Sequence, residues 1–96
     1  MQDPNQFKLG DALRSFLRSN GLEEKFVLAE LKAHWKDWAG SKVDDNTNDL
    51  YLKKGVLTVY LGSGVLKAAL SMRREDLRKH LNKKLGEKAI IRVELR

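Results

Sequence analysis

Cysteine is absent from this chain of 96 residues, and proline occurs only once, at Pro4. The absence of cysteine excludes disulfides, thiol nucleophiles and cysteine-based zinc or iron sites, and it fits a reducing compartment. No apolar run approaches the length that spans a membrane, and the opening residues MQDPNQFKLG show no basic segment followed by an apolar one. Together these absences predict a soluble, cytoplasmic domain without a membrane partner.

Groups that carry catalysis or hold metals are also scarce. The two histidines, His34 and His80, stand far apart and have no recognisable nucleophile as a partner. The segment DDNTND at 44–49 imitates the start of a calcium loop. However, Asp49 stands where the turn needs glycine, and Gly55 stands where a bidentate glutamate should be. We therefore expect a polar linker at 44–49, and no enzyme activity, metal, cofactor or small-molecule substrate.

The length and the hydrophobic pattern predict one small domain. Apolar residues at helical spacing predict two helices that form a helical hairpin, and alternation with a period of two predicts a β-hairpin that turns at Lys54-Gly55. The expected elements are helices over 9–19 and 22–39, strands on either side of the turn from 50 to 61, a long helix over 64–85 and a strand over 89–95. The expected fold is α+β with the order α-α-β-β-α-β, a two-layer domain over 9–96 in which a three-stranded sheet packs against helices. Residues 1–8 are expected to be a flexible N-terminus.

The same periodicities assign inward and outward faces. The inner stripe of the long helix is expected to hold Val65, Leu66, Ala69, Leu70, Leu77 and Leu81, and the last strand is expected to turn Ile91, Val93 and Leu95 inward. The outward face of the sheet is expected to show Tyr51, Lys53, Thr58, Tyr60, Arg92 and Arg96.

The net charge of +6 is concentrated in the last third of the chain. Residues 1–63 carry equal numbers of basic and acidic side chains, whereas residues 64–85 carry seven basic and two acidic ones. Such a basic block attracts polyanions, of which nucleic acid is the commonest in cytoplasm. An anionic membrane, an acidic protein face or a merely solvated helix face is compatible with the same charges.

The candidate nucleic-acid contacts follow from this block and from the outward sheet face. Cations on the back of an amphipathic helix can hold phosphates, and tyrosines between cations can stack on bases, although a solvated antiparallel face also tolerates tyrosine. The candidates are Lys67, Arg73, Arg74, Arg78, Lys79 and Lys83 on the long helix, and Tyr51 and Tyr60 on the sheet.

The stretch VYLGSGVLKAAL at 59–70 raises the question of a phosphate-binding glycine turn. A dinucleotide fingerprint needs a third glycine where Lys67 stands, a Walker loop needs Gly-Lys-Ser/Thr, and a KH-type loop needs two glycines three apart, which the chain lacks. Ser63 is instead expected to cap the following helix. The favoured interpretation is a structural corner, and the alternative is a phosphate contact at the helix N-terminus beside Lys67.

Two tryptophans lie three residues apart in the second helix. Trp35 lies in the middle of the apolar stripe with Leu28 and Leu31, so we expect it in the core. Trp38 falls on the flank of the stripe. A core position is favoured for Trp38 too, and a partly exposed anchor for a partner protein is the alternative.

Four stretches together resemble one family. They are LGDALRSFLRSNGLEEKF, HWKDWAG, LYLKKGVLTVYLGSGVLKAAL and LNKKLGEKAIIRVELR. In their order and spacing they are similar to the DciA-like family, which is linked to loading of the bacterial replicative DNA helicase. The resemblance spans the chain from about Leu9 to Arg96.

This resemblance implies a KH-like domain that binds DNA, single- or double-stranded, and contacts the replicative helicase without hydrolysing nucleotides. The family's tryptophan-to-glycine motif falls on Trp35 and Gly40, and the end of its long helix falls on Leu81-Asn82 and Leu85-Gly86. With the cap residue Ser63, we expect Trp35, Gly40 and Gly86 to be structural. The zinc ribbon of some members is excluded by the absence of cysteine. Two alternatives stay open, namely a KH-like RNA-binding protein and a protein-interaction domain that binds no nucleic acid.

Overall fold

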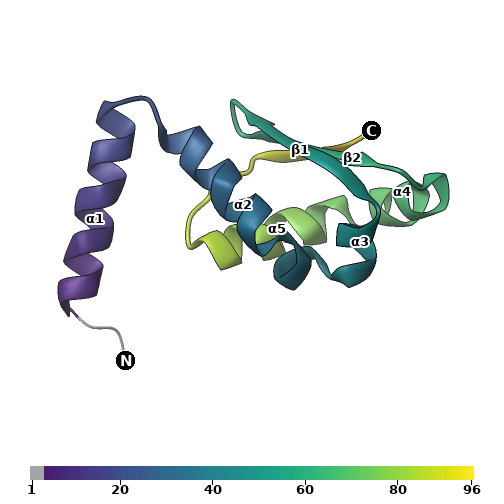
Figure 1. Cartoon of the computed structure of the whole chain (residues 1–96), viewed down its shortest axis with the longest axis horizontal. Coiled ribbons are helices and arrows are strands. Elements are labelled where there is room, and N and C mark those ends of the chain that lie inside the picture. Colours follow the sequence, from purple (N-terminus) through teal and green to yellow (C-terminus); the bar gives the residue numbers. More distant parts are fainter. Residues whose placement is uncertain (1–3) are drawn as a thin grey trace.

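The computed structural model describes residues 4–96, with side chains from residue 11 onward. Its elements are α1 (Pro4–Ser19), α2 (Glu23–Ala39), α3 (Ser41–Asp45), β1 (Thr47–Lys53), β2 (Val56–Leu61), α4 (Gly64–Ser71), α5 (Arg74–Leu85) and β3 (Arg92–Leu95). The α+β class and the order α-α-β-β-α-β are confirmed, with a short α3 added and the long helix divided in two. Figure 1 shows that α2 and α5 lie on one side of the sheet.

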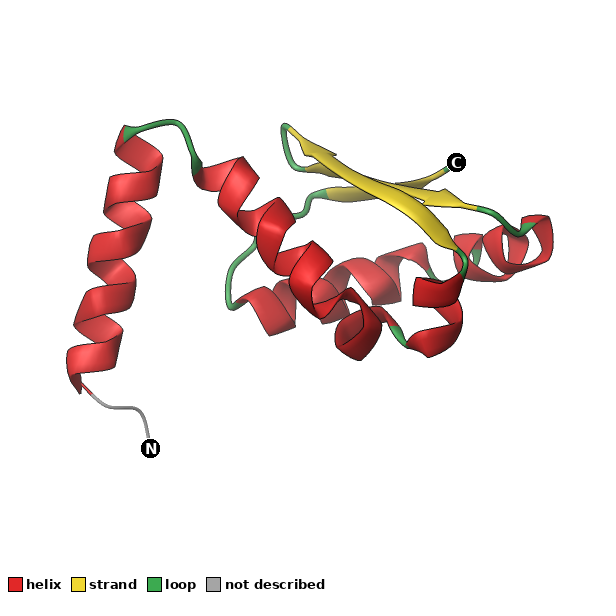
Figure 2. Cartoon of the chain, viewed as in Figure 1, coloured by secondary structure: helices red, strands yellow, loops and turns green. Residues whose placement is uncertain are grey.

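The sheet has the order β1-β2-β3, with β1 antiparallel and β3 parallel to the central β2. Lys54 and Gly55 connect β1 to β2 with φ angles of 51° and 79°. Two successive positive φ angles are typical of the tight turn that matches the twist of a hairpin. Figure 2 shows helices on one side of the sheet only, which leaves its other face open.

The core lies between the sheet and the two helices. The predicted alternation is confirmed for the hairpin, because Leu50 and Leu52 of β1 and Leu57 and Val59 of β2 are all buried. Across from them the helices contribute Val27, Leu31, Trp35 and Leu81, and Ile90 closes the end of the core. Trp35 is 3% exposed, which confirms its core assignment.

The expected continuous helix over 64–85 is wrong, because the chain breaks between α4 and α5. Arg73 leaves the helical conformation (φ −123°, ψ 21°), and its N–H donates to the carbonyl of Leu70 at 2.8 Å. Leu66 and Leu70 are the residues of α4 that pack against the core. Val65 and Ala69, one position before each of them, are exposed, Val65 to 84%, although both were expected to face inward.

The polar linker expected at 44–49 is also wrong. Residues up to Asp45 complete α3, and β1 begins at Thr47. The Thr47 hydroxyl donates to the carbonyl of Val43 at 2.6 Å and accepts from Trp35 Nε1 at 2.9 Å. These two hydrogen bonds attach the end of α3 and the start of β1 to the core tryptophan, which leaves no room for a free loop.

The last strand is shorter than expected, and the inward residue before it is Ile90 rather than Ile91. The buried Asn82 side chain holds both backbone groups of Ile90: Asn82 Nδ2 donates to the carbonyl at 2.8 Å, and Asn82 Oδ1 accepts from the N–H at 2.9 Å. Ile91 is 67% exposed and lies over the hairpin turn, where its N–H donates to the carbonyl of Gly55 at 2.8 Å. Val93 is buried and Leu95 is half-buried, as expected.

On the outer face of the sheet, Thr58 differs from its expected exposure. It points outward but is buried. Its strand is central, and its register partners are Tyr51 on β1 and Glu94 on β3. The longer side chains on both sides cover the short threonine.

The first helix begins at Pro4, five residues before the expected start, and it does not form a closely packed hairpin with α2. Figure 1 shows α1 standing away from the rest of the chain beyond a short link. Gly21 makes that link with a φ of 65°. Leu17 is half-buried, whereas Leu13 and Phe16 of the same apolar stripe are exposed.

Replacement of Asn82 by alanine is expected to lower the free energy of unfolding by about 1–3 kcal/mol, the cost of one buried polar group without a partner. The change leaves the buried N–H of Ile90 without a partner, and its carbonyl keeps only the 3.4 Å hydrogen bond from Arg78 Nη1. Urea denaturation monitored by circular dichroism measures the loss. Asn20→Ala is the matched control, because it removes only the exposed hydrogen bond from Asn20 to the carbonyl of Phe16. Equal losses in the two variants would contradict a structural role for Asn82.

Candidate nucleic-acid interface

The glycine turn at 62–64 is a capped corner. The Ser63 hydroxyl accepts from the N–H of Leu66 at 3.2 Å, which confirms the expected N-cap of α4. Gly62 uses its own N–H to donate to the carbonyl of Asn46 at 2.7 Å. Because this N–H is occupied within the fold and neither glycine has a positive φ, the turn does not form a concave nest of backbone donors.

Arg78 differs most from its expected role as an outward cation. Its side chain is only 23% exposed and makes a bidentate pair with Glu75, at 2.8 Å from Nε and 3.1 Å from Nη2. A third nitrogen, Nη1, lies 3.4 Å from the carbonyl of Ile90. The hydrogen bond from Arg78 lowers the pKa of the Glu75 carboxyl, and the same bond raises the pKa of Arg78. The guanidinium is thus engaged by the protein itself.

The other predicted cations separate into groups because the helix is broken. Lys67 lies on α4, Arg73 lies at the break, and Arg74 is exposed at the start of α5. Lys79 and Lys83 lie one turn apart on α5 and line an open cleft. We call this cleft the basic cleft; its lining residues are Arg78, Lys79, Asn82, Lys83, Gly86, Glu87 and Lys88.

The predicted candidates omit Lys88, which the structure adds to the basic cleft. Gly86 ends α5 in the left-handed conformation (φ 76°, ψ 17°), as expected of its position, and turns the chain back so that Lys88 lies near Lys79 and Lys83. Lys79, Lys83 and Lys88 make no ion pair within residues 11–96. The signal in the sequence was the Leu85-Gly86 helix end, which predicts a reversal of the chain.

The open face of the sheet carries the two tyrosines. Tyr51 and Tyr60 are both exposed and line a shallow hollow together with Asn48 and Asp49. The register places Asp49 opposite Tyr60 and Thr58 opposite Tyr51, so the two rings are diagonal neighbours.

The acids of this face offset only part of its positive charge. Arg92 and Arg96 share one carboxylate, Glu94, at 2.9 and 3.4 Å, and Asp49 lies 3.7 Å from Lys32 of α2. Lys53 is exposed and makes no ion pair within residues 11–96. The sheet therefore offers aromatic surface with a small excess of positive charge.

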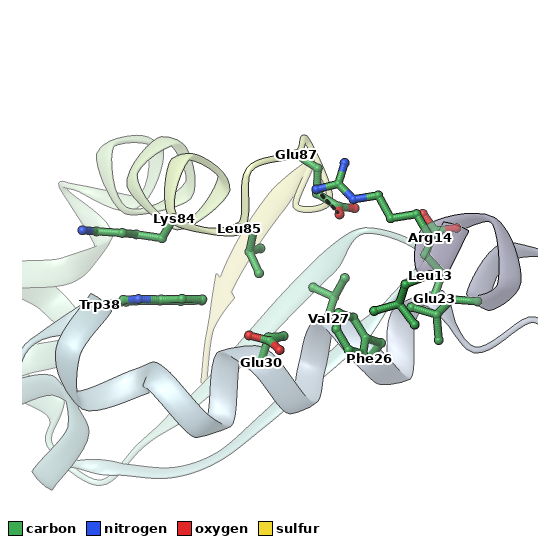
Figure 3. A pocket seen from close by; sticks show the side chains of 11 residues that line it. Leu13, Arg14, Glu23, Phe26, Val27, Glu30, Trp38, Lys84, Leu85 and Glu87 are labelled. Atoms are coloured by element: carbon green, nitrogen blue, oxygen red, sulfur yellow. Dashed lines mark ion pairs between the residues drawn. The ribbon is translucent and has the colours of Figure 1, made fainter. Parts of the chain in front are cut away.

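Trp38 is half-buried, so its exposure is intermediate between the favoured core position and the alternative of a partly exposed anchor. Its ring stacks on His34 with centroids 4.7 Å apart and an interplanar angle of 17°. It lines two hollows. The tryptophan hollow, on the side of the helix break, is lined by Trp38, Ala39, Val43, Leu70, Arg73, Asp76, Leu77 and His80. The second hollow lies between α1, α2 and the end of α5, with Trp38 and Lys84 at one end (Figure 3).

Gly40 ends α2 with a φ of 97°, a conformation that side chains rarely adopt, and its N–H donates to the carbonyl of Lys36 at 3.1 Å. Its carbonyl accepts from Asp44, so the same residue also begins α3. Among residues 4–96 no helix is long and apolar enough to cross a membrane. Within the same part of the chain no group of three or more His, Asp or Glu side chains is arranged to hold a metal ion.

Comparison with known protein families gives a match over nearly the whole chain. The family model described as "Dna[CI] antecedent, DciA" matches residues 8–95. No curated protein matches the chain, and no solved structure matches it.

Replacement of Arg78 by methionine is expected to raise the pKa of Glu75 toward its ordinary value of 4.5, since the Arg78 hydrogen bond is the largest cause of its lowering. In the parent protein this pair stabilises the fold above the ordinary pKa of the carboxyl, and the contribution is lost as the pH falls through the lowered pKa. Carbon-detected NMR of the glutamate carboxyls measures the titration. Lys79→Met is the control, with a smaller rise; an equal or larger rise in this variant would contradict the assignment.

Proposed function

The chain belongs to the DciA family, and on this premise we propose that it is a non-enzymatic nucleic-acid-binding module that helps to load or operate the replicative DNA helicase. The family's role is associated with the helicase and with nucleic acid rather than with a class of enzymes. In the proposed mechanism, one surface of the domain holds DNA by its phosphates while another surface contacts the helicase.

The observation that carries the DNA-binding proposal is the basic cleft. Lys79, Lys83 and Lys88 bring three ammonium groups around one open cleft, without an ion pair to neutralise them among the described residues. Release of counterions from a phosphate backbone drives binding to such a surface without any need for base contacts. Arg78 supports the cleft wall through its bond to Glu75 and is a positioning residue rather than a phosphate ligand.

The remaining predicted cations extend the surface. Arg73 and Arg74 lie at the start of α5, and Lys67 lies on α4 behind the Ser63 corner. In the proposal Arg74 and Lys67 meet phosphates farther along the strand, whereas Arg73 lies between the two surfaces and borders the tryptophan hollow. Arg74 and Lys67 act through long-range attraction rather than through a shared pocket.

The tyrosines favour single strands as the ligand. Bases of a single strand are free to stack on exposed aromatic rings, at about 1–3 kcal/mol per base, whereas those of a duplex are stacked on each other. Tyr51 and Tyr60 offer two such rings on a face with a small excess of positive charge. Stacking on the sheet and phosphate contacts at the basic cleft are thus separate contributions.

The tryptophan hollow is the proposed contact for the helicase. Trp38 presents a large, half-buried ring that His34 holds in place, next to the apolar Leu70 and Leu77. A preorganised aromatic ring within an apolar hollow is typical of the anchors that dominate protein interfaces. Arg73, Asp76 and His80 give the hollow a polar rim.

Replacement of both Lys79 and Lys83 by glutamate is expected to weaken binding of a single-stranded DNA oligonucleotide at least about tenfold. The slope of log affinity against log salt should fall by about 1.4, since about 0.7 counterion is released per phosphate contact on single strands. Fluorescence anisotropy at several salt concentrations measures both, with duplex DNA and RNA titrated in parallel.

The matched control is the Lys25→Glu, Lys36→Glu variant, which makes the same change in charge on exposed positions of α2. Equal losses in the two variants would show that binding depends only on net charge. RNA bound well above DNA by the parent protein would support the RNA-binding alternative instead.

Replacement of Trp38 by alanine is expected to abolish retention on the immobilised cognate replicative helicase while DNA affinity stays unchanged. Trp38→Phe, which keeps an aromatic ring, should retain most of the binding. Full retention of Trp38→Ala would move the helicase contact to another surface. No retention of the parent protein would contradict the helicase part of the proposal, and the anisotropy titrations would still test the DNA part.

A further inference from the structure

Apolar side chains lie exposed where α1 and α2 meet, and no other part of the described chain covers them. Leu13 and Phe16 on α1 are 42% and 58% exposed, and Leu22 and Phe26 at the start of α2 are 37% and 39% exposed. We call these four residues the α1–α2 patch. Single exposed apolar side chains need no explanation, but several on adjoining helices indicate an interface.

The patch continues into a groove along α2. A cavity of about 190 Å³ lies between the three helices, and its apolar lining includes Leu17, Val27 and Leu85 (Figure 3). Phe26 and Trp38, which line it from α2, are twelve residues apart on one helix, a distance of about 18 Å. A groove of that length accommodates about three turns of another helix.

The charges beside the groove indicate which helix fits. Residues 11–19 of α1 carry two arginines and one aspartate, whereas residues 22–30 at the start of α2 carry three glutamates and one lysine. The pairs that join α1 to its own chain are long and partly exposed, with Arg14 at 3.6 Å from Glu87 and Arg18 at 3.7 Å from Glu23. Exposed pairs of this kind contribute little stability. A basic, amphipathic helix is therefore the complement of the acidic start of α2, and α1 is itself such a helix.

The exposed stripe of α1 is also complementary to itself. Leu13 and Phe16 lie three residues apart, and Asn20, just past the end of α1, follows after four, the spacing of a seam between two helices. If two copies of α1 run antiparallel about a two-fold axis between positions 13 and 16, Leu13 of each copy faces Phe16 of the other. Such an isologous contact closes at two chains and leaves no open apolar end.

We propose that two copies of the chain associate through the α1–α2 patch, with the α1 helices antiparallel and each basic α1 resting against the acidic start of α2 in the other copy. The four helices then form one apolar layer that covers Leu13, Phe16, Leu22 and Phe26. The basic cleft of α5 is not part of this interface, so each copy keeps its own nucleic-acid surface. This association goes beyond the proposed function and does not depend on it.

Sedimentation equilibrium of nuclease-treated protein, from micromolar to hundreds of micromolar, tests the proposal. The parent protein is expected to dimerise, and Phe16→Glu is expected to raise the dissociation constant at least about tenfold, because it places a charge in the apolar seam. Val65→Glu is the matched control, since Val65 is 84% exposed on α4, and it should dimerise like the parent. Circular dichroism checks that each variant stays folded.

The orientation is tested by disulfide formation, which the absence of native cysteine makes specific. A mixture of Leu13→Cys and Phe16→Cys chains should form the mixed disulfide faster than either variant forms its own. A parent protein that stays monomeric throughout the concentration range would overturn the proposal. So would a dimer that tolerates Phe16→Glu. Protection of Leu13→Cys from alkylation only when the helicase is added would assign the patch to that partner and likewise overturn self-association.

Discussion

The arrangement of the C-terminal half depends on the hydrogen bonds between Asn82 and Ile90. One amide side chain satisfies both backbone groups of a residue that lies in no strand and is fully buried. The two bonds fix Ile90 in the core and set the point from which β3 enters beside β2. They also hold the chain after Gly86 against α5, where Lys88 joins Lys79 and Lys83. One buried contact thus positions both the third strand and the basic cleft.

The sequence pattern predicted those elements whose geometry is decided by residues close together in the chain. The hairpin follows from alternation and from the two positive φ angles at its turn, and the helix end at Gly86 follows from the freedom of glycine in the left-handed region. The helix break was not predictable in this way, because SMRRED contains neither glycine nor proline and every residue in it tolerates a helix. There the packing of Leu66, Leu70 and Leu77 onto one core overrides local propensity.

The candidate site likewise combines features that the sequence pattern predicts with features that only tertiary contacts determine. An angular projection along one continuous helix places Lys67, Arg74 and Arg78 together, but the break removes Lys67 from that face, and Arg78 turns toward Glu75 and Ile90. Lys79 and Lys83 remain neighbours because they lie four residues apart within α5. Lys88 joins them only through the reversal at Gly86. Charge counted along the sequence identified the basic region, and tertiary contacts decided which cations stay unpaired.

Glu87 connects the basic cleft with the first helix. Among the described residues it is the only carboxylate that lines the cleft, and it also borders the groove between α1 and α2, where Arg14 lies 3.6 Å away (Figure 3). The arginine of α1 therefore offsets the one negative charge next to Lys79, Lys83 and Lys88. At this separation near the surface the attraction is modest and falls with salt, but its sign is definite. Any contact that holds α1 in place also keeps Arg14 beside Glu87, and so keeps the basic cleft positive. The apolar contacts of α1 and the positive charge of the basic cleft therefore favour the same arrangement of the chain.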